Sequence, residues 1–535
     1  MSSAPPRPSA TTHEPITALG PLRLPVFRML WITWLTANTT MWMNDVAAAW
    51  LMTSLGPSPL WVALVQAAST LPVFLLGLPS GALADILDRR RYFMVTQFWV
   101  AGIASVISVC VLAGVMTAPL LLLLTFANGV GLAMRWPVFA AIIPEVVPRP
   151  LLPQGLALNG IAMNGSRIIG PLVAGALIAG AGSAWVFVLN AVLSLVAGFI
   201  IMRWRREHKE SPLGRERLGS AMRVGVQYVR QSARLRGLLL RVSLFFLHAT
   251  ALLALLPLVA RALPGGSAGT FTVLLASMGS GAIVAALLMP RIRRAMTLQK
   301  LVFTGTVLQS VGMVVAAYAP RVYVAVPAMF LAGTAWITVA NSLTVAAQMA
   351  LPDWVRARGM SIYQMAIMGA TATGAALWGQ VATWTSIHES LAIAAATSVL
   401  LMALAQWLVK DRGSEEDLTP SRVLKVPDIP VRPGAGRVQT RVEYLINPAH
   451  EREFRALMEE SKRSRLSQGA LDWQLLHSLD QPGRYVEQII DPSWTEHLRR
   501  FDRITAADAR LRERRLAFHI GEGPPQVTRY LIEQD

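Results

Sequence analysis

Twelve long apolar stretches limit what this chain can fold into more than any other feature of its sequence. A helix needs about 20 apolar residues to cross a hydrocarbon core of about 30 Å. The stretches occupy about 29–52, 60–83, 93–116, 119–143, 155–179, 184–202, 238–260, 269–290, 300–318, 322–348, 360–383 and 388–409. They predict an all-α polytopic membrane protein with twelve transmembrane helices in two six-helix halves, embedded in a lipid bilayer.

Composition and charge agree with a membrane location. Only 15% of the 535 residues are charged and the mean hydropathy is +0.46, whereas a soluble domain is about 25% charged. The net charge of +18 comes from the apolar region, because residues 411–535 hold 20 basic and 21 acidic residues. Such a distribution is typical of topology-setting loops and argues against a nucleic-acid surface. The single cysteine, Cys110, can form neither a disulfide framework nor a thiolate metal site. The sequence also shows no cluster of metal ligands, and no metal is expected.

The loop charges predict the orientation. With the N-terminus inside, 25 of the 29 basic residues before residue 411 face the cytoplasm. Of the others, Arg135 and Arg167 fall within helices, and Arg261 and Arg321 fall in outside loops. An even number of helices places both termini in the cytoplasm. Residues 1–24 lack an apolar segment and are expected to be a cytoplasmic tail, not a signal peptide.

A long basic loop after the sixth stretch divides the membrane region into equal halves, a plan that transporters use. Twelve helices alone would also fit a channel, a receptor or a membrane enzyme. The expected domains are the tail 1–24, a first half 25–202, a cytoplasmic central loop 203–237, a second half 238–410, a linker 411–436 and a soluble domain 437–535.

The sharpest motif lies between the second and third stretches, at residues 81–91. Gly81 lets two helices approach closely because it has no Cβ. Asp85 lies where the chain leaves the bilayer and can meet a helix N-terminus or an arginine. With Asp88, Arg89 and Arg90, the spacing resembles motif A of the major facilitator superfamily, which carries glycine at the position of Asp88. A simple topology anchor would also account for the arginines.

The fifth stretch carries a second motif. Small residues at positions 166, 170 and 174 lie on one helix face, which favours close packing, and Pro171 bends the helix. A kinked helix in any bundle would explain this pattern. With Ser166, Gly170, Pro171 and Gly175, the segment also resembles motif C, the signature of the superfamily's drug and metabolite exporters.

The membrane region as a whole resembles the enterobactin-exporter-like branch of that superfamily, on segments that include 42–50, 72–91, 159–175 and 356–359. The resemblance implies a rocker-switch exporter of a siderophore- or drug-like small molecule in the bacterial inner membrane. The sequence contains no Gly-rich phosphate loop with its lysine, which argues against direct use of ATP. A proton gradient is therefore the expected driving force, and no cofactor is expected.

Asp45, Arg135 and Arg167 are charged residues that lie well away from the ends of the predicted helices. Charges in hydrocarbon are costly and usually face a cavity or a partner. Asp45 is the candidate coupling residue, unless it pairs with an arginine. The arginines either neutralise carboxylates, Asp45 or Glu145 among them, or handle substrate or protons, and the sequence leaves both interpretations open.

Position alone predicts three cavity contacts, Asn38, Trp336 and Gln364. Other tryptophans, including Trp34 and Trp42, mostly fall near helix ends, where anchoring at the membrane interface is the expected role.

Residues after 436 have the composition of a soluble α+β domain. Strands are expected at 438–446, 473–478, 484–490 and 527–532, with one helix to about 466 and helical runs between Ser493 and 516. The order βαββαβ predicts a ferredoxin-like fold.

The segment 493–500 resembles antibiotic-biosynthesis-monooxygenase-like domains, which are dimeric α/β barrels. Trp494 and His497 share a helix face there, as part of a pocket or in packing. The domain is expected to be an enzyme that acts on the cargo, or a homodimerisation or regulatory module without activity.

Overall fold

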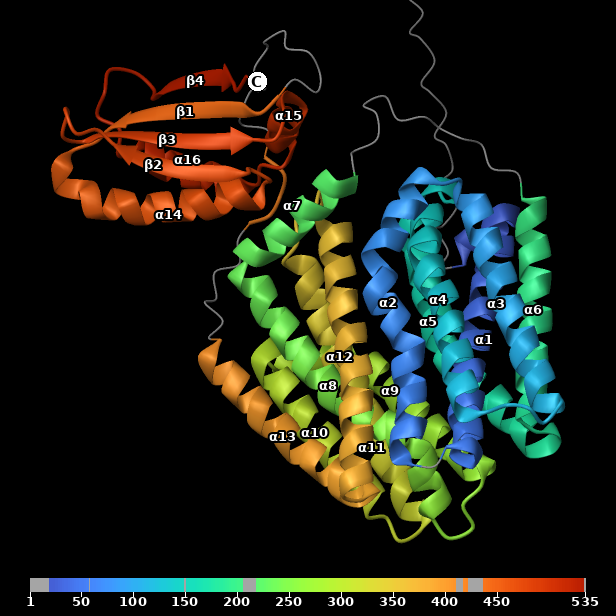
Figure 1. Cartoon of the computed structure of the whole chain (residues 1–535). Helices are drawn as coiled ribbons and strands as arrows, with labels where there is room; N and C mark the ends of the chain where they lie inside the picture. The colour runs from blue at the N-terminus through green and yellow to red at the C-terminus, as the bar shows by residue number, and fades with distance from the viewer. Residues whose placement is uncertain are drawn as a thin grey trace, which may run out of the picture.

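The computed structural model describes residues 19–56, 58–148, 151–204, 218–409, 417–421 and 436–533. Most of the expected N-terminal tail and linker lie outside these residues. At some helix residues, including Gly81, Asp85 and Glu145, the structure describes the backbone only. The chain forms a bundle of long helices with a small α+β domain at one end (Figure 1).

The first half of the bundle consists of six helices after a short 3-10 turn, η1 (Gly20–Arg23). They are α1 (Pro25–Leu55), α2 (Pro59–Ile86), α3 (Arg89–Leu112), α4 (Ala118–Val146), α5 (Leu152–Ala181) and α6 (Ser183–Arg203). Proline stands in the first turn of α1, α2, α4 and α5, where its missing amide hydrogen is not needed.

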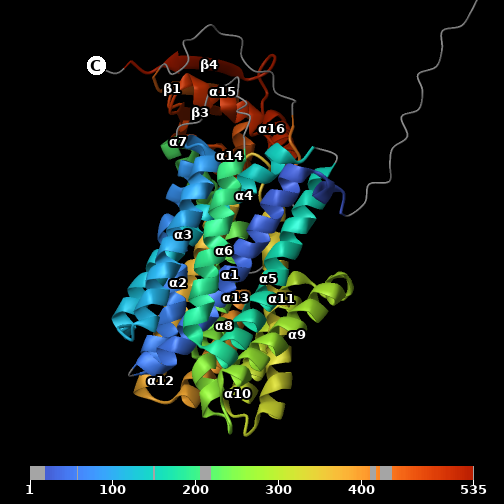
Figure 2. The same cartoon turned by 90° about the vertical axis from the view of Figure 1, so that its right-hand side faces the viewer.

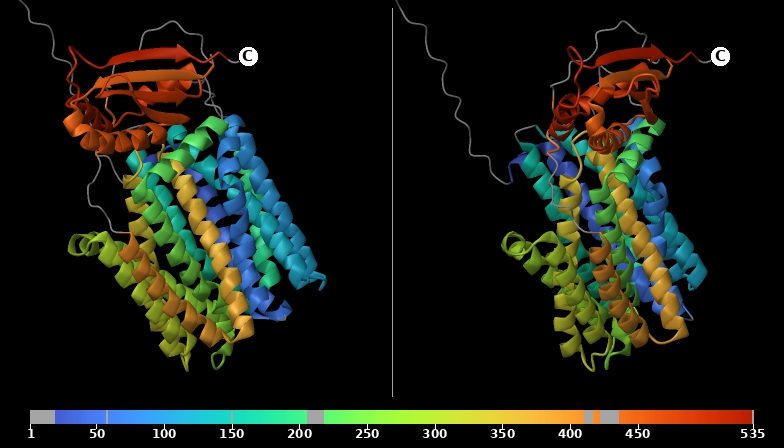
Figure 3. Two further views of the ribbon diagram at one scale, coloured as in Figure 1. Left: turned by 60° about the vertical axis from the view of Figure 1, so that its left-hand side comes forward. Right: turned by 90° about the vertical axis from the view of Figure 1, so that its left-hand side faces the viewer.

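The second half also consists of six long helices. They are α8 (Ala233–Ala262), α9 (Ala268–Ala295), α10 (Leu298–Ala317), α11 (Val322–Met349), α12 (Arg356–Trp384) and α13 (Ile387–Leu408). Serine or threonine caps α8, α9, α10 and α13, with the side chain accepting a hydrogen bond from an amide of the first turn. The halves lie side by side, with the soluble domain at the same end of both (Figures 2 and 3).

Ten helices within the described residues are long and apolar enough to cross a membrane. The two long helices that fall short of this measure are α1 and α12. Helix α1 carries Asn38, Asn44 and Asp45, and α12 carries Arg356 and many small or polar residues. Both contribute to the contact between the halves, and this position explains why they are more polar than helices that face lipid.

A helix occupies part of the expected central loop. Helix α7 (Leu218–Gln231) packs against the soluble domain on one side and against α12 on the other. It is amphipathic and only 14 residues long, too short to cross a membrane. A search for long apolar stretches does not detect such a helix. The seventh long helix also begins earlier than expected, at Ala233.

The soluble domain is a four-stranded antiparallel sheet with helices on one face. Its elements are β1 (Val438–Leu445), η3 (Pro448–His450), α14 (Glu451–Ser467), β2 (Asp472–His477), β3 (Arg484–Asp491), α15 (Trp494–Asp502), α16 (Ala506–Leu516) and β4 (Gln526–Leu531). The strand order is β2-β3-β1-β4. Alternate residues of β1 and β3 are buried, among them Tyr444 and Ile489, and they pack on Phe454 of α14.

Candidate functional site

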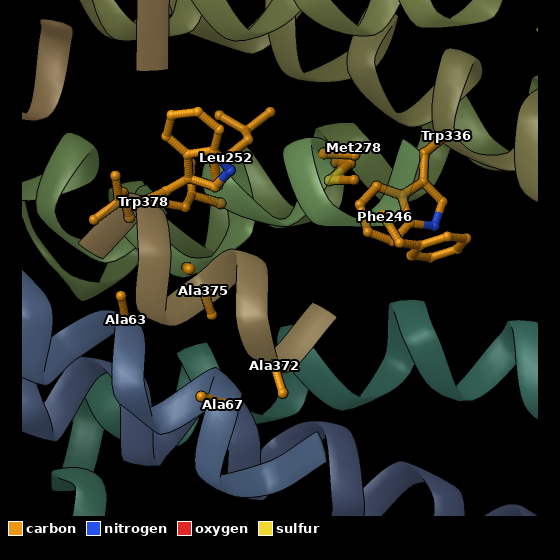
Figure 4. Close-up of a cluster of buried hydrophobic side chains, with 14 of the residues drawn as sticks. Ala63, Ala67, Phe246, Leu252, Met278, Trp336, Ala372, Ala375 and Trp378 are labelled. Atoms are coloured by element: carbon orange, nitrogen blue, oxygen red, sulfur yellow. The ribbon is translucent and has the colours of Figure 1, made fainter. Parts of the chain in front are cut away.

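Small residues bring the two halves together along α2 and α12. Ala63 and Ala67 of α2 lie opposite Ala372 and Ala375 of α12 (Figure 4). A Cβ added to Gly379 would lie 2.5 Å from the Cβ of Ala63. A larger side chain at Gly379 would therefore push the helices apart.

Hydrogen bonds join the halves at the end away from the soluble domain. Arg261 of α8 donates to the backbone oxygen of Thr53 at 2.6 Å and lies 5.3 Å from the centre of the Trp50 ring. The amide of Leu60 donates to the hydroxyl of Thr383 at 3.3 Å. These contacts link the ends of α1, α2, α8 and α12, so the halves are tied together at this end of the bundle.

Asp45 lies at the interface between the halves. Its carboxylate accepts a hydrogen bond from the hydroxyl of Ser69 on α2 at 3.4 Å. It lines a cavity of about 20 Å³, room for about one water molecule, together with Gln66 of α2 and Leu253 and Ala254 of α8. Within the described part of the chain, no cation pairs with Asp45. Movement of one half against the other would therefore change the surroundings of an uncompensated carboxylate.

Arg135 is buried between α4 and α1. Its guanidinium donates to the backbone oxygen of Ala37 at 3.1 Å and lies 5.7 Å from the centre of the Trp34 ring. Trp34 in turn stacks on Phe139 with ring centres 4.1 Å apart. Arg135 thus contacts a carbonyl and an aromatic ring, and it forms no ion pair with Asp45.

Arg167 of α5 also lies over a tryptophan of α1. Its guanidinium is 5.2 Å from the centre of the Trp42 ring, and both side chains are partly exposed. Arg167 forms no hydrogen bond or ion pair with the residues that the structure describes. Trp34 is buried beneath Arg135, which differs from the expected anchoring at the membrane interface, and Trp42 lies partly exposed beneath Arg167.

The residues of the proposed motif C lie at two close helix contacts. A Cβ added to Gly170 would lie 2.5 Å from the Cβ of Trp42 on α1, and one added to Gly175 would collide with Thr272 on α9. The hydroxyl of Ser166 donates to the backbone oxygen of Ala162 at 2.6 Å. Pro171 lies within α5, which continues on both sides of it. The motif thus packs α5 against its own half and against the other half.

The basic turn of the proposed motif A joins α2 to α3. Asp88 caps α3 by accepting a hydrogen bond from the amide of Arg91 at 2.8 Å, which gives a local reason for aspartate at this position. Arg90 donates to the backbone oxygens of Ile201, at 3.3 Å, and Met202 at the end of α6. A guanidinium there compensates unpaired helix carbonyls. Arg89 is partly exposed. The structure describes the backbone at Gly81 and Asp85, but not the contacts of these two residues.

The three expected cavity contacts differ in position. Trp336 packs inside the second half, with its ring centre 5.1 Å from that of Phe246 (Figure 4). Asn38 is buried and its amide donates to the backbone oxygen of Trp34 at 2.8 Å. Gln364 of α12 is partly exposed, so it alone of the three leaves part of its side chain accessible.

In the soluble domain, Trp494 and His497 stack on one face of α15, and both are buried. The Nδ1 of His497 lies 2.7 Å from a carboxylate oxygen of Asp491, and Arg529 donates to its Nε2 at 3.2 Å. Because Nε2 accepts, the ring proton is on Nδ1 and is donated to Asp491. Burial lowers the pKa of His497, so the imidazole is neutral at pH 7. These contacts are those of a packed side chain.

A second buried carboxylate, Glu487, was not predicted from the sequence. It accepts hydrogen bonds from Trp473 at 3.0 Å and Ser461 at 2.9 Å, and it pairs with Arg465 at 3.3 Å and Arg515 at 3.0 Å. Burial by itself would raise the pKa of Glu487, but the two arginines hold it at about 2. The partners come from α14, β2 and α16, so no local sequence signal would identify them. Within the described residues, no cluster of histidine, cysteine and acidic side chains is suited to a metal ion.

The packing of two helical halves can be compared with known proteins. Residues 16–535 match the family model described as transmembrane secretion effector. The chain belongs to this family. It is a transmembrane transporter of the major facilitator type, and the matched range includes its soluble domain. No curated protein sequence matches this chain.

Solved structures share the fold at low sequence identity. A bacterial homologue of the human lysosomal transporter Spinster, inward-facing and unoccupied, is 14% identical with a TM-score of 0.58, and the match covers 73% of this chain and 96% of that one. A mutant of the nucleoside transporter NupG is 12% identical with a TM-score of 0.61, over 72% of this chain and 100% of that one. A POT family transporter in complex with 5-aminolevulinic acid is 11% identical with a TM-score of 0.59, over 74% and 98%. At this identity the likeness shows the fold alone.

Proposed function

We propose that this transporter exports a small molecule from the cytoplasm in exchange for protons, by alternating access between its two halves. The observation that carries the proposal is the position of Asp45 at the interface between the halves. Its carboxylate lies between α1, α2 and α8, with a serine hydroxyl as its hydrogen-bond partner and no paired cation in the described region. A carboxylate at the interface of two moving halves can bind a proton in one state and release it in the other.

All twelve long helices would cross the membrane, with the soluble domain on the cytoplasmic side. The excess of basic residues in loops at that end supports this orientation. The halves are tied together at the opposite end through Arg261 with Thr53 and Leu60 with Thr383. The structure would then be the state in which the outer side is closed.

Small residues would let the halves rock while they remain in contact. Gly379 meets Ala63, and Gly175 meets Thr272, so backbones approach closely on both sides of the central region. Arg90, bound to the end of α6, and Asp88, the cap of α3, would hold the turn between α2 and α3 in place during this movement.

Proton-dependent uptake into everted membrane vesicles tests the proposal. Vesicles that contain the wild-type protein are compared with vesicles that lack it, using a panel of siderophores and drugs. We expect uptake that requires the proton gradient and stops when an ionophore collapses the gradient. Uptake that does not depend on the gradient would contradict proton coupling, and accumulation only in right-side-out vesicles would contradict export.

For the soluble domain, we propose a ferredoxin-like regulatory module that acts through α7. Arg223 and Gln227 of α7 donate to the backbone oxygens of Gly469 and Ala470 at 3.2 and 2.6 Å. On the membrane side, the ring of Tyr228 on α7 packs edge-on against Trp354 with centres 5.7 Å apart. Helix α7 thus connects the soluble domain to the loop that leads into α12.

The soluble domain also contacts this loop directly. Arg503 lies 5.4 Å from the centre of the Trp354 ring and pairs with Glu496 at 2.8 Å. Because α12 lines the interface between the halves, a domain held on this loop can favour one arrangement of the halves. The buried, paired His497 favours this role over the enzymatic alternative.

Replacing Arg223 and Gln227 together by alanine tests the regulatory role. We expect faster hydrogen exchange at residues 469–471 and a changed transport rate with unchanged expression. Exchange that speeds up without any change in transport would contradict regulation. Measurement of the particle mass separates this role from dimerisation, which would give the wild type twice the mass of one chain, and oxygen consumption with an aromatic donor would support the enzymatic alternative.

A further inference from the structure

The position of Arg167 on α5 lies between the residues that contact α1 and those that contact α9 of the other half. Successive residues of a helix are rotated by about 100°. Positions 166 and 170 contact α1, whereas positions 168 and 175 contact α9 of the other half. Residues Ile161, Ile169 and Leu172 are exposed on the outer side. Position 167 lies between the first two groups and opposite the exposed group, so its side chain is directed inward.

The Arg167 guanidinium lacks an anionic partner among the described residues. Its contact is the face of the Trp42 ring, 5.2 Å away, and the side chain is partly exposed. A guanidinium stacked on a ring keeps the N–H groups at its edge free. These edge groups match the two oxygens of a carboxylate or another oxyanion.

A second arginine extends this arrangement along α1. Trp34, Asn38 and Trp42 are spaced four residues apart and therefore lie along one face of the helix. Arg135 covers Trp34 in the same manner as Arg167 covers Trp42. Arg135 is buried and donates to a backbone oxygen, whereas the side chain of Arg167 is partly exposed. This face of α1 thus carries two tryptophan rings, each beneath an arginine.

We propose that Arg167 and Trp42 form the substrate site of this transporter and that the site binds an organic anion with an aromatic or flat apolar body. The oxyanion pairs with the edge of the Arg167 guanidinium, and the apolar body lies against the Trp42 ring. Arg135 strengthens the preference for negative charge. This inference rests on the proposed transport function and adds the charge of the substrate to it.

Equilibrium binding without a proton gradient tests the inference on the full chain in lipid nanodiscs. The probes are naphthalene-2-carboxylate, its neutral carboxamide and the 2-naphthylmethylammonium cation, which share one apolar body. We expect the wild type to bind the carboxylate about tenfold or more tightly than the amide, as a charge-assisted hydrogen bond implies. The cation should bind more weakly than either.

The variant Arg167→Gln should reduce the preference for carboxylate over amide to about one while leaving amide binding unchanged. Arg167→Lys should keep part of the preference, because it retains the charge but not the fork of donors. The control Arg321→Gln removes an exposed charge outside the site and should bind as the wild type does. Elution as a single species in size-exclusion chromatography shows that each variant is folded.

Three outcomes would overturn the inference: equal binding of carboxylate and amide by the wild type, no binding of the carboxylate, or an unchanged preference in Arg167→Gln. The result is separable from the test of transport. Charge-selective binding without gradient-driven uptake would overturn the transport proposal alone, and gradient-driven uptake without charge selectivity would overturn this inference alone.

Discussion

The membrane bundle and the soluble domain differ in whether their buried charges are paired with opposite charges. In the soluble domain, Glu487 pairs with Arg465 and Arg515, and Asp491 pairs with Arg500 at 2.9 Å. In the bundle, Asp45 is bound by a serine hydroxyl, while Arg135 and Arg167 lie on tryptophan rings.

This difference separates two reasons for keeping a charge inside a protein. A paired and hydrogen-bonded charge contributes to a fixed structure, and removing one partner leaves the other buried and uncompensated. An unpaired charge inside a membrane protein does not stabilise the fold in this way and is usually retained for transport or ion binding. Substitutions of the buried charges in the soluble domain should therefore lower its stability, whereas substitutions of the buried charges in the bundle should impair transport.

The largest effect is expected for Asp45→Asn. The amide keeps the shape of the side chain but cannot exchange a proton, so gradient-driven uptake into everted vesicles should fall to the level of vesicles without the protein. Thermal unfolding of the purified chain should change little. The matched control Glu389→Gln removes an exposed carboxylate in the first turn of α13 and should transport normally. Normal uptake by Asp45→Asn would end the proposal that Asp45 couples proton and substrate movement.

In the soluble domain, Glu487→Gln should cost about 3–5 kcal/mol of stability, because Arg465 and Arg515 lose their counter-charge in a buried place. Pulse proteolysis of the soluble domain within the full chain measures this loss. The control Glu443→Gln breaks the partly exposed pair with Arg484 and should cost about 1 kcal/mol or less. Similar losses in the two variants would contradict the contrast between buried and exposed pairs.

Acid should unfold the soluble domain in a way that depends on the same carboxylate. The pKa of Glu487 is about 2 in the folded domain and ordinarily 4.5, so the folded state favours the deprotonated form. This contribution to stability is present above about pH 4.5 and is lost as the pH falls toward 2. Proteolysis as a function of pH should show it, with a weaker acid dependence in Glu487→Gln. An identical pH profile in that variant would show that other groups dominate.

The smallest effect is expected for Gly175→Ala in α5. Its new methyl group would collide with Thr272 across the interface between the halves, at a cost of about 1–3 kcal/mol in this packed state. We expect a transport rate changed by several-fold in the vesicle assay. The control Gly180→Ala adds a methyl group in the same helix where no heavy atom lies within 4 Å, and it should transport as the wild type does. Equal rates in both variants would show that this contact does not limit the movement.

Much of the architecture follows from sequence periodicity. The long apolar stretches predicted the long helices of the bundle, with boundaries that differ by up to five residues, because a backbone buried in an apolar surrounding demands continuous hydrogen bonding within each segment. In the soluble domain, alternating strands and a capping residue such as Ser493 also appear in the structure as expected. These signals are local, since each depends on residues within one element.

Helix α7 is local in extent but was not anticipated, because its 14 residues match neither an apolar stretch nor a strand. Its role became visible once Arg223 was found on Gly469 and Tyr228 on Trp354. Those partners are far apart in the chain.

The sequence by itself determined where this chain is apolar, that Ser493 caps a helix of the soluble domain, and that Asp45, Arg135 and Arg167 lie within the bundle. Only the tertiary structure decided which of them have partners. Hydropathy and capping act over a few neighbouring residues, whereas the partner of a buried charge is chosen by how separate helices pack. Glu487 and Asp45 both carry a carboxylate, and the fold gives arginines to one and a serine to the other.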